Sequence, residues 1–151
     1  EKTGEEIALQ FVNSNCFLFL ISNDSDRLDH LEKKIGDKKY KAEINFVQCV
    51  KDGCWEADII MLAVPCAEKK GVAELMHEVA TQKIVVVFSN EERDAEELSK
   101  FLPYSKLVRV SGDIHTKSII INGNDEAVNE EISEIFNEAG YHVSISLATK
   151  N

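Results

Sequence analysis

The sequence predicts an α/β fold in which helices cover both faces of a doubly wound, mainly parallel sheet, giving three layers. Two patterns support this class. Short apolar runs alternate along the chain with amphipathic stretches, as in repeated strand–helix–strand units. Several of these runs are continuously apolar, which is typical of parallel strands buried on both faces. With 44% hydrophobic residues and no linker or low-complexity tract, residues 1–151 are expected to form one domain.

The expected strands are short runs rich in Val, Ile, Leu and Phe, at 16–21, 44–47, 59–64, 84–88, 107–110, 119–121 and 143–145. The expected helices repeat an apolar residue every three or four positions, at 7–12, 28–35, 72–79, 95–101 and 125–138. A polar run after residue 21 supplies N-cap residues for the second helix, and Gly36 ends it. Asp52 and Gly53 predict a turn between the second and third strands.

The chain carries 17 Lys and Arg against 27 Asp and Glu, a formal net charge of −10. This excess of acid argues against nucleic acid and against an anionic membrane surface as partners, and no apolar run is long enough to span a bilayer. The four cysteines show no C-x-x-C pair and no metal-type spacing with histidine. We therefore expect no metal site and free thiols in a reducing, cytoplasmic compartment, with a disulfide pair as the open alternative.

The ends of the expected strands are the places to look for a ligand, because open parallel sheets bind ligands beyond the carboxyl ends of their strands. Ser22, Asn23 and Asp24 follow the first expected strand, Ala63 to Pro65 end the third, and Asn90 follows the fourth. These residues are small or polar, which suits the close approach of a nucleotide. A role in reversing the chain is the alternative, because turn-forming residues follow most strands.

The run Gly4-Glu5-Glu6-Ile7-Ala8 matches the end of the dinucleotide-binding pattern G-x-G-x-x-G-x-x-[IL]-A. In that pattern the third glycine lets a helix pack closely on a strand, and the helix N-terminus faces the pyrophosphate. Gly4 takes the place of the third glycine, and Glu1 falls where the second belongs. The helix that begins near Gly4 is therefore the expected phosphate-binding helix.

Three further segments carry a resemblance to a known family: Ala57 to Pro65, Ile84 to Asn90, and Ile119 to Tyr141. They are similar to the "AD-hydrophobic-hydrophobic-LAVP" strand, the "VVxDxTNP" strand and the closing strand–helix–strand of the deazaflavin (coenzyme F-420)-dependent NADP reductases. From Gly4 to Leu147 the chain resembles the NAD(P)-binding domain of that family. The resemblance implies a Rossmann-like domain that binds NADP or NAD at the strand ends and transfers hydride to or from a partner molecule.

Carried over residue by residue, the resemblance also implies contacts with the dinucleotide. Gly4 would border the pyrophosphate, Ser22 and Asn23 would meet the adenosine ribose or its 2′-phosphate, and Asn90 would approach the nicotinamide. The path between the two ends would be lined by Ala63, Val64 and Pro65.

Two charged residues bear on the choice between NADP and NAD. Arg27 could reach back from its helix to a 2′-phosphate, or it could simply face solvent. Asp24 would repel a 2′-phosphate and accept a hydrogen bond from a ribose 2′-hydroxyl instead, which favours NAD.

The chain departs from the family's pattern at both ends of the expected site. The first strand and the first two glycines are absent, so two apolar edges, at 16–21 and 59–64, are expected to lie side by side unpaired. We expect the functional chain to begin roughly eight to ten residues earlier, the length of a strand and a turn. The segment that would build a substrate pocket, ahead of Ile119, is short. His115 lies there at the correct edge for a general acid, although a solvated side chain is favoured.

The favoured function is that of an NAD(P)-binding oxidoreductase, intact or degenerate, with an unidentified small-molecule substrate and unknown catalytic residues. Hydride transfer needs little from the protein beyond positioning of the cofactor, so the lack of an assembled acid–base pair does not exclude it. The alternative is a noncatalytic Rossmann-like module for nucleotide sensing or self-association, for example as a homodimer. A purely structural interaction domain is a third option.

Overall fold

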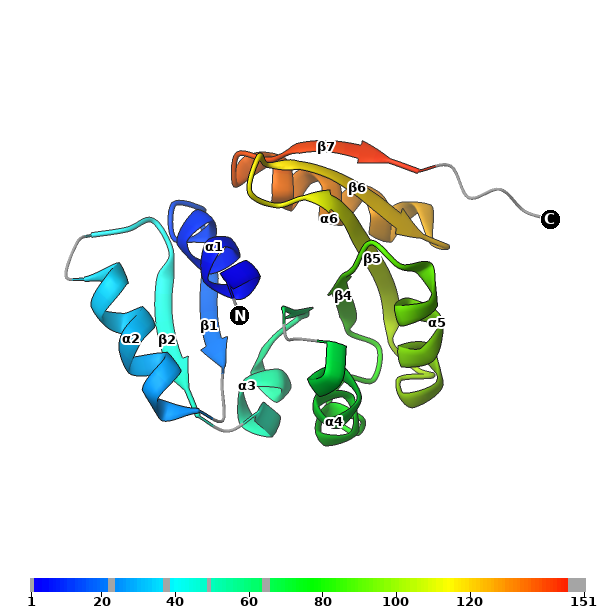
Figure 1. The fold of residues 1–151 in the computed structure, drawn as a ribbon, viewed down its shortest axis with the longest axis horizontal. Coiled ribbons are helices and arrows are strands. Elements are labelled where there is room, and N and C mark those ends of the chain that lie inside the picture. Colours follow the sequence, from blue (N-terminus) through cyan, green and yellow to red (C-terminus); the bar gives the residue numbers. More distant parts are fainter. Residues whose placement is uncertain (1, 22–23, 37–38, 49, 64–65, 147–151) are drawn as a thin grey trace.

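The computed structural model describes residues 2–21, 24–36, 39–48, 50–63 and 66–146, and helices and strands alternate along them as the sequence predicts (Figure 1). The helices are α1 Lys2–Phe11, α2 Ser25–Ile35, α3 Val50–Glu56, α4 Cys66–Met76, α5 Glu92–Phe101 and α6 Glu126–Glu138. The strands are β1 Phe17–Ile21, β2 Glu43–Val47, β3 Ile59–Leu62, β4 Ile84–Phe88, β5 Lys106–Asp113, β6 Ser118–Gly123 and β7 His142–Ile145. No helix within these ranges is long and apolar enough to cross a membrane.

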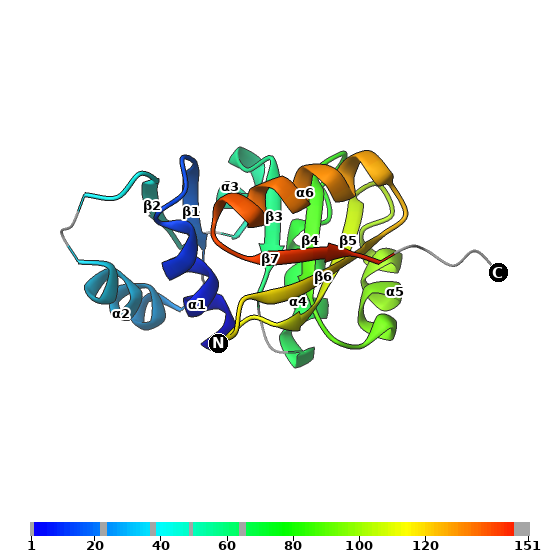
Figure 2. The same cartoon turned by 90° about the horizontal axis from the view of Figure 1, so that it is seen from above.

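In the described part of the chain, the strands form two separate sheets. One has the order β1-β2 and the other the order β3-β4-β5-β6-β7. All neighbouring strands are parallel except β5 and β6, which form an antiparallel hairpin. A wider space separates β1 from β3 than separates neighbouring strands of the larger sheet (Figure 2). The expectation that the edges of these two strands are unpaired is therefore confirmed, and the fold is a Rossmann-like α/β fold with a divided sheet.

The larger sheet is covered on both faces, and β4 is its central element. The residues of β4 alternate between two buried clusters: Ile84 and Val86 belong to the one that includes α1 and α6, and Val85 and Val87 to the one that includes α4 and α5. We call these the α1–α6 cluster and the α4–α5 cluster. Burial on both faces explains why the sequence of β4 is continuously apolar.

Helix α1 packs against both sheets. Its residues Ile7 and Phe11 belong to the α1–α6 cluster, whereas Ala8 and Val12 belong to a third cluster that contains residues of β1 and α2. Phe11 meets Phe136 of α6 edge to face, with ring centroids 5.3 Å apart. Since β1 and β3 share no ladder, α1 provides a direct packing connection between the two parts of the sheet.

Two expectations about local structure were wrong. The strand at 16–21 was expected to be buried on both faces, but β1 pairs only with β2 and its first residue, Phe17, is 71% exposed. The turn at Asp52 and Gly53 is instead part of α3. This helix is held because Cys54 is buried in the α4–α5 cluster and the Lys83 ammonium donates to the last carbonyl oxygens of the helix, including that of Cys54.

The packing of α1 predicts the effect of shortening Phe11. The Phe11→Ala variant is expected to lower the free energy of unfolding by about 3–5 kcal/mol, because it empties a site in contact with two other rings. Chemical denaturation of the original protein and the variant measures this loss. Phe17→Ala is the matched control and should cost less than about 1 kcal/mol, since Phe17 is mostly exposed. Equal losses in the two variants would contradict the role given to α1.

The same cluster predicts a pH dependence at alkaline pH. Burial, and to a smaller extent the charge of Glu6, raises the pKa of Tyr141 to about 12. A tyrosine in the unfolded chain ionises near pH 10, so this contribution to stability is complete below about pH 10 and is lost as the pH rises towards about 12. Urea unfolding at about pH 9 and 11 should show the loss. Tyr141→Phe should reduce it, whereas Tyr104→Phe, which alters an exposed ring, should leave it unchanged.

Candidate functional site

The N-terminus of α1 lies against the carboxyl end of β3. A Cβ atom placed on Gly4 would be 3.2 Å from the carbonyl oxygen of Ala63 and 3.4 Å from its Cβ atom. Such contacts are tighter than ordinary van der Waals packing, so glycine lets the helix approach the strand end closely. The structure therefore brings together two of the residues that the sequence places at the site, Gly4 and Ala63.

Asp24 and Arg27 lie where β1 leads into α2. Asp24 is the N-cap of α2, and its carboxylate accepts hydrogen bonds from the backbone N–H groups of Asp26 and Arg27, at 3.0 and 3.4 Å. The Arg27 Nε atom lies 3.4 Å from Asp24 Oδ2, and both side chains are about half exposed. The acid that would accept from a ribose hydroxyl and the base that would meet a 2′-phosphate thus form an ion pair with each other.

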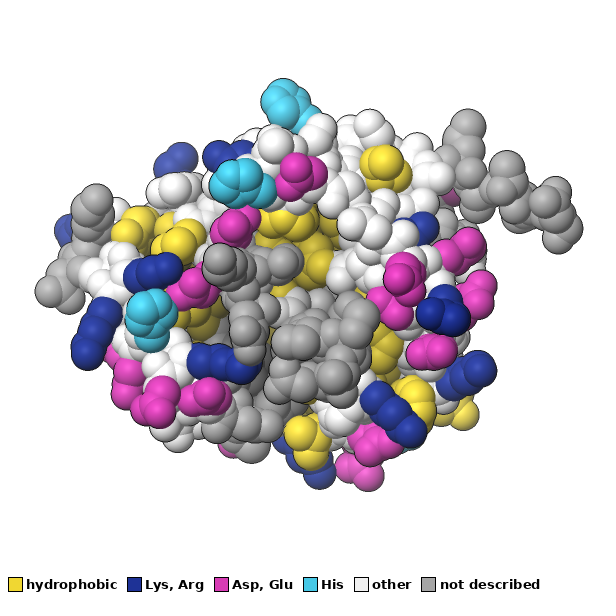
Figure 3. Space-filling model, in the orientation of Figure 1, with side chains coloured by type: hydrophobic (Ala, Val, Ile, Leu, Met, Phe, Trp, Pro, Cys, Tyr) yellow, Lys and Arg dark blue, Asp and Glu magenta, His cyan; other side chains and the backbone are white. Residues whose placement is uncertain are grey.

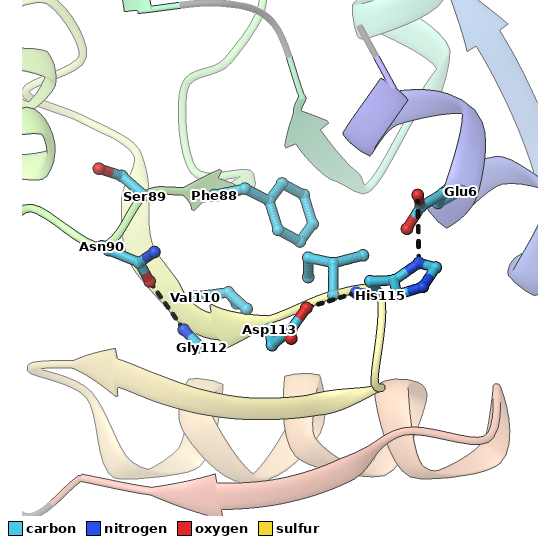
Figure 4. A pocket seen from close by; sticks show the side chains of 9 residues that line it. Glu6, Phe88, Ser89, Asn90, Val110, Gly112, Asp113 and His115 are labelled. Atoms are coloured by element: carbon cyan, nitrogen blue, oxygen red, sulfur yellow. Dashed lines mark hydrogen bonds and ion pairs between the residues drawn. The ribbon is translucent and has the colours of Figure 1, made fainter.

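A cleft of about 300 Å³ opens at the carboxyl ends of β4 and β5, beside α1 (Figure 4). It is lined by Glu6, Phe88, Ser89, Asn90, Val110, Gly112, Asp113, Ile114 and His115. Asn90, a predicted site residue, accepts a hydrogen bond from the backbone N–H of Gly112 through its Oδ1 atom, at 2.9 Å. This bond ties the loop after β4 to the end of β5.

Three cleft residues on its polar side were not included in the predicted site. Glu6 of α1 approaches His115 of the turn between β5 and β6, with Oε1 and Nδ1 3.7 Å apart. Asp113 Oδ1 accepts from the backbone N–H of His115 at 2.9 Å. The His115 side chain is 83% exposed, as expected of a solvated residue, yet it lies in the cleft. Glu6 could have been found from the sequence, because it lies two residues after Gly4 in the expected phosphate-binding helix.

The space-filling view shows how polar and apolar groups are distributed on this face (Figure 3). The face is hollowed near its centre, where hydrophobic side chains are visible, and acidic and histidine side chains gather at the upper edge of the hollow. Glu5, next to Glu6, forms an ion pair with Lys34 of α2, with 3.3 Å between its carboxylate and Nζ, and its carboxylate is also 3.5 Å from His30 Nε2. The two acidic residues at the start of α1 therefore have different surroundings: Glu5 contacts side chains of α2, whereas Glu6 lies in the cleft.

Four predicted site residues, Ser22, Asn23, Val64 and Pro65, lie outside the described residues. Within the described ranges, no group of three or more His, Cys, Asp or Glu side chains is placed to hold a metal ion. A second cleft, of about 260 Å³, lies at the opposite edge of the sheet, near Lys106 and Asn124. The edge that carries Gly4, Ala63, Asp24 and Asn90 is the one at which parallel sheets bind ligands.

The arrangement suits the binding of an extended ligand along this edge. The first turn of α1 presents backbone N–H groups, which favour phosphate, and the cleft at the far end has an apolar floor formed by Phe88, Val110 and Ile114. Ser89 is held in place, since its hydroxyl donates to the Asp94 carboxylate at 2.5 Å. The site can thus position a ligand and needs to supply little further chemistry for a hydride transfer.

Comparison with protein families identifies a match over the first three-fifths of the chain. The model of the family described as "NADP oxidoreductase coenzyme F420-dependent" matches residues 2–91, which include α1 and the strands up to β4. No curated protein matches the chain.

Several solved structures share the fold. A pyrroline-5-carboxylate reductase from Coxiella burnetii superposes with a TM-score of 0.75 at 17% identity, over 98% of this chain and 56% of that one. A hypothetical protein from Sinorhizobium meliloti gives 0.73 at 17% identity, over 96% and 80%. A pyrroline carboxylate reductase from Plasmodium falciparum, solved with NADP bound, gives 0.64 at 16% identity, over 96% and 52%. The chain thus spans about half the length of the two reductases.

The end of β5, beside the turn that closes the cleft, requires a glycine at position 112. Gly112 has φ +102, and a Cβ there would lie 2.5 Å from the Ser118 carbonyl oxygen, so Gly112→Ala should lower the free energy of unfolding by about 2 kcal/mol or more. Gly71→Ala is the control: among the described residues, no atom outside the neighbouring turns of α4 lies within 4 Å of its Cβ position, and the change should stabilise by up to about 1 kcal/mol. Thermal unfolding of the two variants measures these changes in stability. If Gly112→Ala leaves the stability unchanged, the backbone geometry at the end of β5 is contradicted.

Proposed function

The chain belongs to the family of coenzyme F420-dependent NADP oxidoreductases, and from this membership we propose that it binds NADP or NAD and transfers hydride between the nicotinamide and a small molecule. The dinucleotide would lie across the carboxyl ends of β1, β3 and β4. Its nicotinamide supplies the hydride chemistry, and the protein's part is to bind and orient it. The chain spans only about half of the length of the two solved reductases, and the proposal therefore names no substrate beyond a small molecule.

The observation that carries the proposal is the contact between Gly4 and Ala63. It places the N-terminus of a ten-residue helix at the carboxyl end of a parallel strand, with only a glycine between them. A helix N-terminus offers unpaired N–H groups and a partial positive charge, which is the arrangement that binds a pyrophosphate. Gly4 would therefore border the pyrophosphate, and Ala63, with Val64 and Pro65, would line the path beside it.

The two ends of the dinucleotide are assigned from the same edge. The adenosine ribose would meet Asp24 together with Ser22 and Asn23, and the nicotinamide would enter the cleft beside Asn90. NADP would require Arg27 to exchange its ion pair with Asp24 for the 2′-phosphate. NAD would require only that Asp24 accept from the 2′-hydroxyl. Both side chains are about half exposed, so either exchange needs no rearrangement of buried groups.

A second candidate function is self-association without catalysis. The unpaired edges of β1 and β3 favour it, because an open strand edge offers hydrogen-bonding groups to another chain. Analytical ultracentrifugation distinguishes the two: a dimer that persists without dinucleotide and shows no dinucleotide binding would favour this second function.

The proposal predicts that dinucleotides stabilise the protein. At about 100 times the dissociation constant, NADP or NAD should add about 2.7 kcal/mol of stability, which corresponds to an increase in Tm of roughly 5–10 °C for a protein of this size. Thermal unfolding with NADP+, NADPH, NAD+ and NADH measures this. The absence of a shift with all four at millimolar concentration would contradict the proposal.

Substitution at the helix N-terminus provides the matched variant. Gly4→Leu should abolish the shift, because its side chain would collide with Ala63 and push the start of α1 away from β3. Gly71→Leu places the same side chain in open space in α4 and should keep the shift. If Gly4→Leu binds dinucleotide as tightly as the original protein, the contact between Gly4 and Ala63 is not needed for binding, and the proposal loses its main support.

A further inference from the structure

The cleft beside Asn90 is lined by acidic side chains, although the proposed ligand carries negatively charged phosphates. Its polar side contains the carboxylates of Glu6 and Asp113, and none of the described residues that line it is Lys or Arg. We infer that this cleft prefers a cationic ring, and that the protein binds the oxidised form of its dinucleotide more tightly than the reduced form. This inference rests on the proposed function, which puts the nicotinamide in the cleft.

The shape of the cleft fits a planar ring. Its apolar part is formed by the side chains of Phe88, Val110 and Ile114, which all contribute to the α1–α6 cluster. Glu6 and His115 lie on one side of Phe88, and Ser89 and Asn90 lie on the other (Figure 4). A ring on the floor would therefore have apolar contacts on one face and the carboxylates of Glu6 and Asp113 near its edge.

The two carboxylates come from elements far apart in the sequence. Glu6 lies in the first turns of α1 and is directed towards the β5–β6 turn, where its Oε1 atom is 3.7 Å from His115 Nδ1. Asp113 ends β5, and its Oδ1 atom also accepts from the backbone N–H groups of His115 and Thr116, at 2.9 and 3.4 Å. Both side chains lie beside His115, Glu6 approaching from α1 and Asp113 from the end of β5 (Figure 4).

Two cations whose side chains the structure describes, Arg109 and Lys117, are close in the sequence to cleft residues but do not line the cleft. Arg109 donates from Nη1 to the carbonyl oxygen of Ser89 at 3.1 Å, but its register partner Val87 belongs to the α4–α5 cluster, so Arg109 lies on the opposite face of the sheet from Val110. Lys117 lies in the turn beyond His115 and is exposed.

The two forms of the cofactor differ in charge at the nicotinamide ring, which the proposed function puts in the cleft. The oxidised nicotinamide ring carries one positive charge, the dihydronicotinamide ring carries none, and the rest of the two molecules is the same. Two carboxylates near the ring attract the oxidised form by Coulomb interaction. Glu6 is 42% exposed on its side chain, so solvent weakens this attraction, and a preference of about three- to tenfold in Kd is expected. Tighter binding of the oxidised form makes the bound cofactor a stronger hydride donor by the same factor, because the two equilibria are linked.

The test is a set of dissociation constants at about pH 8, measured by isothermal titration calorimetry with NADP+, NADPH and 2′-phospho-ADP-ribose, which lacks the nicotinamide. We expect NADP+ to bind about three- to tenfold more tightly than NADPH, and the fragment, which has no ring to contact the apolar floor, to bind less tightly than NADP+. Raising the ionic strength should reduce the ratio. In Glu6→Gln and Asp113→Asn the ratio should fall towards one, whereas in Glu97→Gln it should stay unchanged. Glu97 is an exposed residue of α5 on the other face of the sheet, and its variant makes the same change in net charge.

The outcomes separate this inference from the function on which it rests. Equal binding of NADP+ and NADPH, tighter binding of NADPH, or a ratio that survives in the Glu6→Gln/Asp113→Asn double variant would overturn the inference while leaving dinucleotide binding intact. Failure of all four dinucleotides, NADP+, NADPH, NAD+ and NADH, to bind would overturn the proposed function, and the inference with it. If only NAD+ and NADH bind, the same ratio is measured with that pair. Circular dichroism of each variant checks that the fold is retained.

Discussion

The packing of α1 between two separate sheets is the interaction on which the rest of the structure depends. Ile7 and Phe11 on one side, and Ala8 and Val12 on the other, bury this helix against β-strands that share no hydrogen bonds with one another. The same helix also reaches α6, since Gln10 donates to the backbone carbonyl of Ala139. This packing holds the N-terminus of α1 over the carboxyl end of β3. The proposed binding edge therefore depends on the position of α1.

The strands and most of the helices could be predicted because burial leaves a direct pattern in the sequence. The β4 strand is buried on both faces and is continuously apolar, whereas β6 buries Ile119 and Ile121 and leaves Ile120 41% exposed. Helix α3 could not be predicted, because Asp52 and Gly53 favour a turn locally and the groups that hold the helix, such as Lys83, lie about 30 residues further along. Phe17 points to the face of the sheet opposite Leu18 and Leu20, which pack against the cluster that contains residues of α1 and α2. Which face of a strand is covered is a property of the assembled fold and not of the strand.

The candidate site divides in the same way. Gly4, Ala63, Asp24 and Asn90 could be predicted because each belongs to a local pattern, a helix start or a strand end, and the structure places each of them at the corresponding end of α1, β3, β1 or β4. Glu6, Asp113 and His115 could not be grouped from the sequence, because α1 and the β5–β6 turn are more than 100 residues apart and meet only in the folded chain. The charge of the cleft, and with it any selectivity, is therefore a tertiary property.

Amide hydrogen exchange with and without NADP+ tests the central claim most directly, namely that the N-terminus of α1 and the strand ends beneath it form the dinucleotide site. The account predicts that saturating NADP+ slows exchange in residues 4–8, at 63, and at 89–90 and 112–115, while the opposite edge near Lys106 and Asn124, where the second cleft lies, is unaffected. Protection confined to that opposite edge, or bound NADP+ that leaves the start of α1 unprotected, would contradict it.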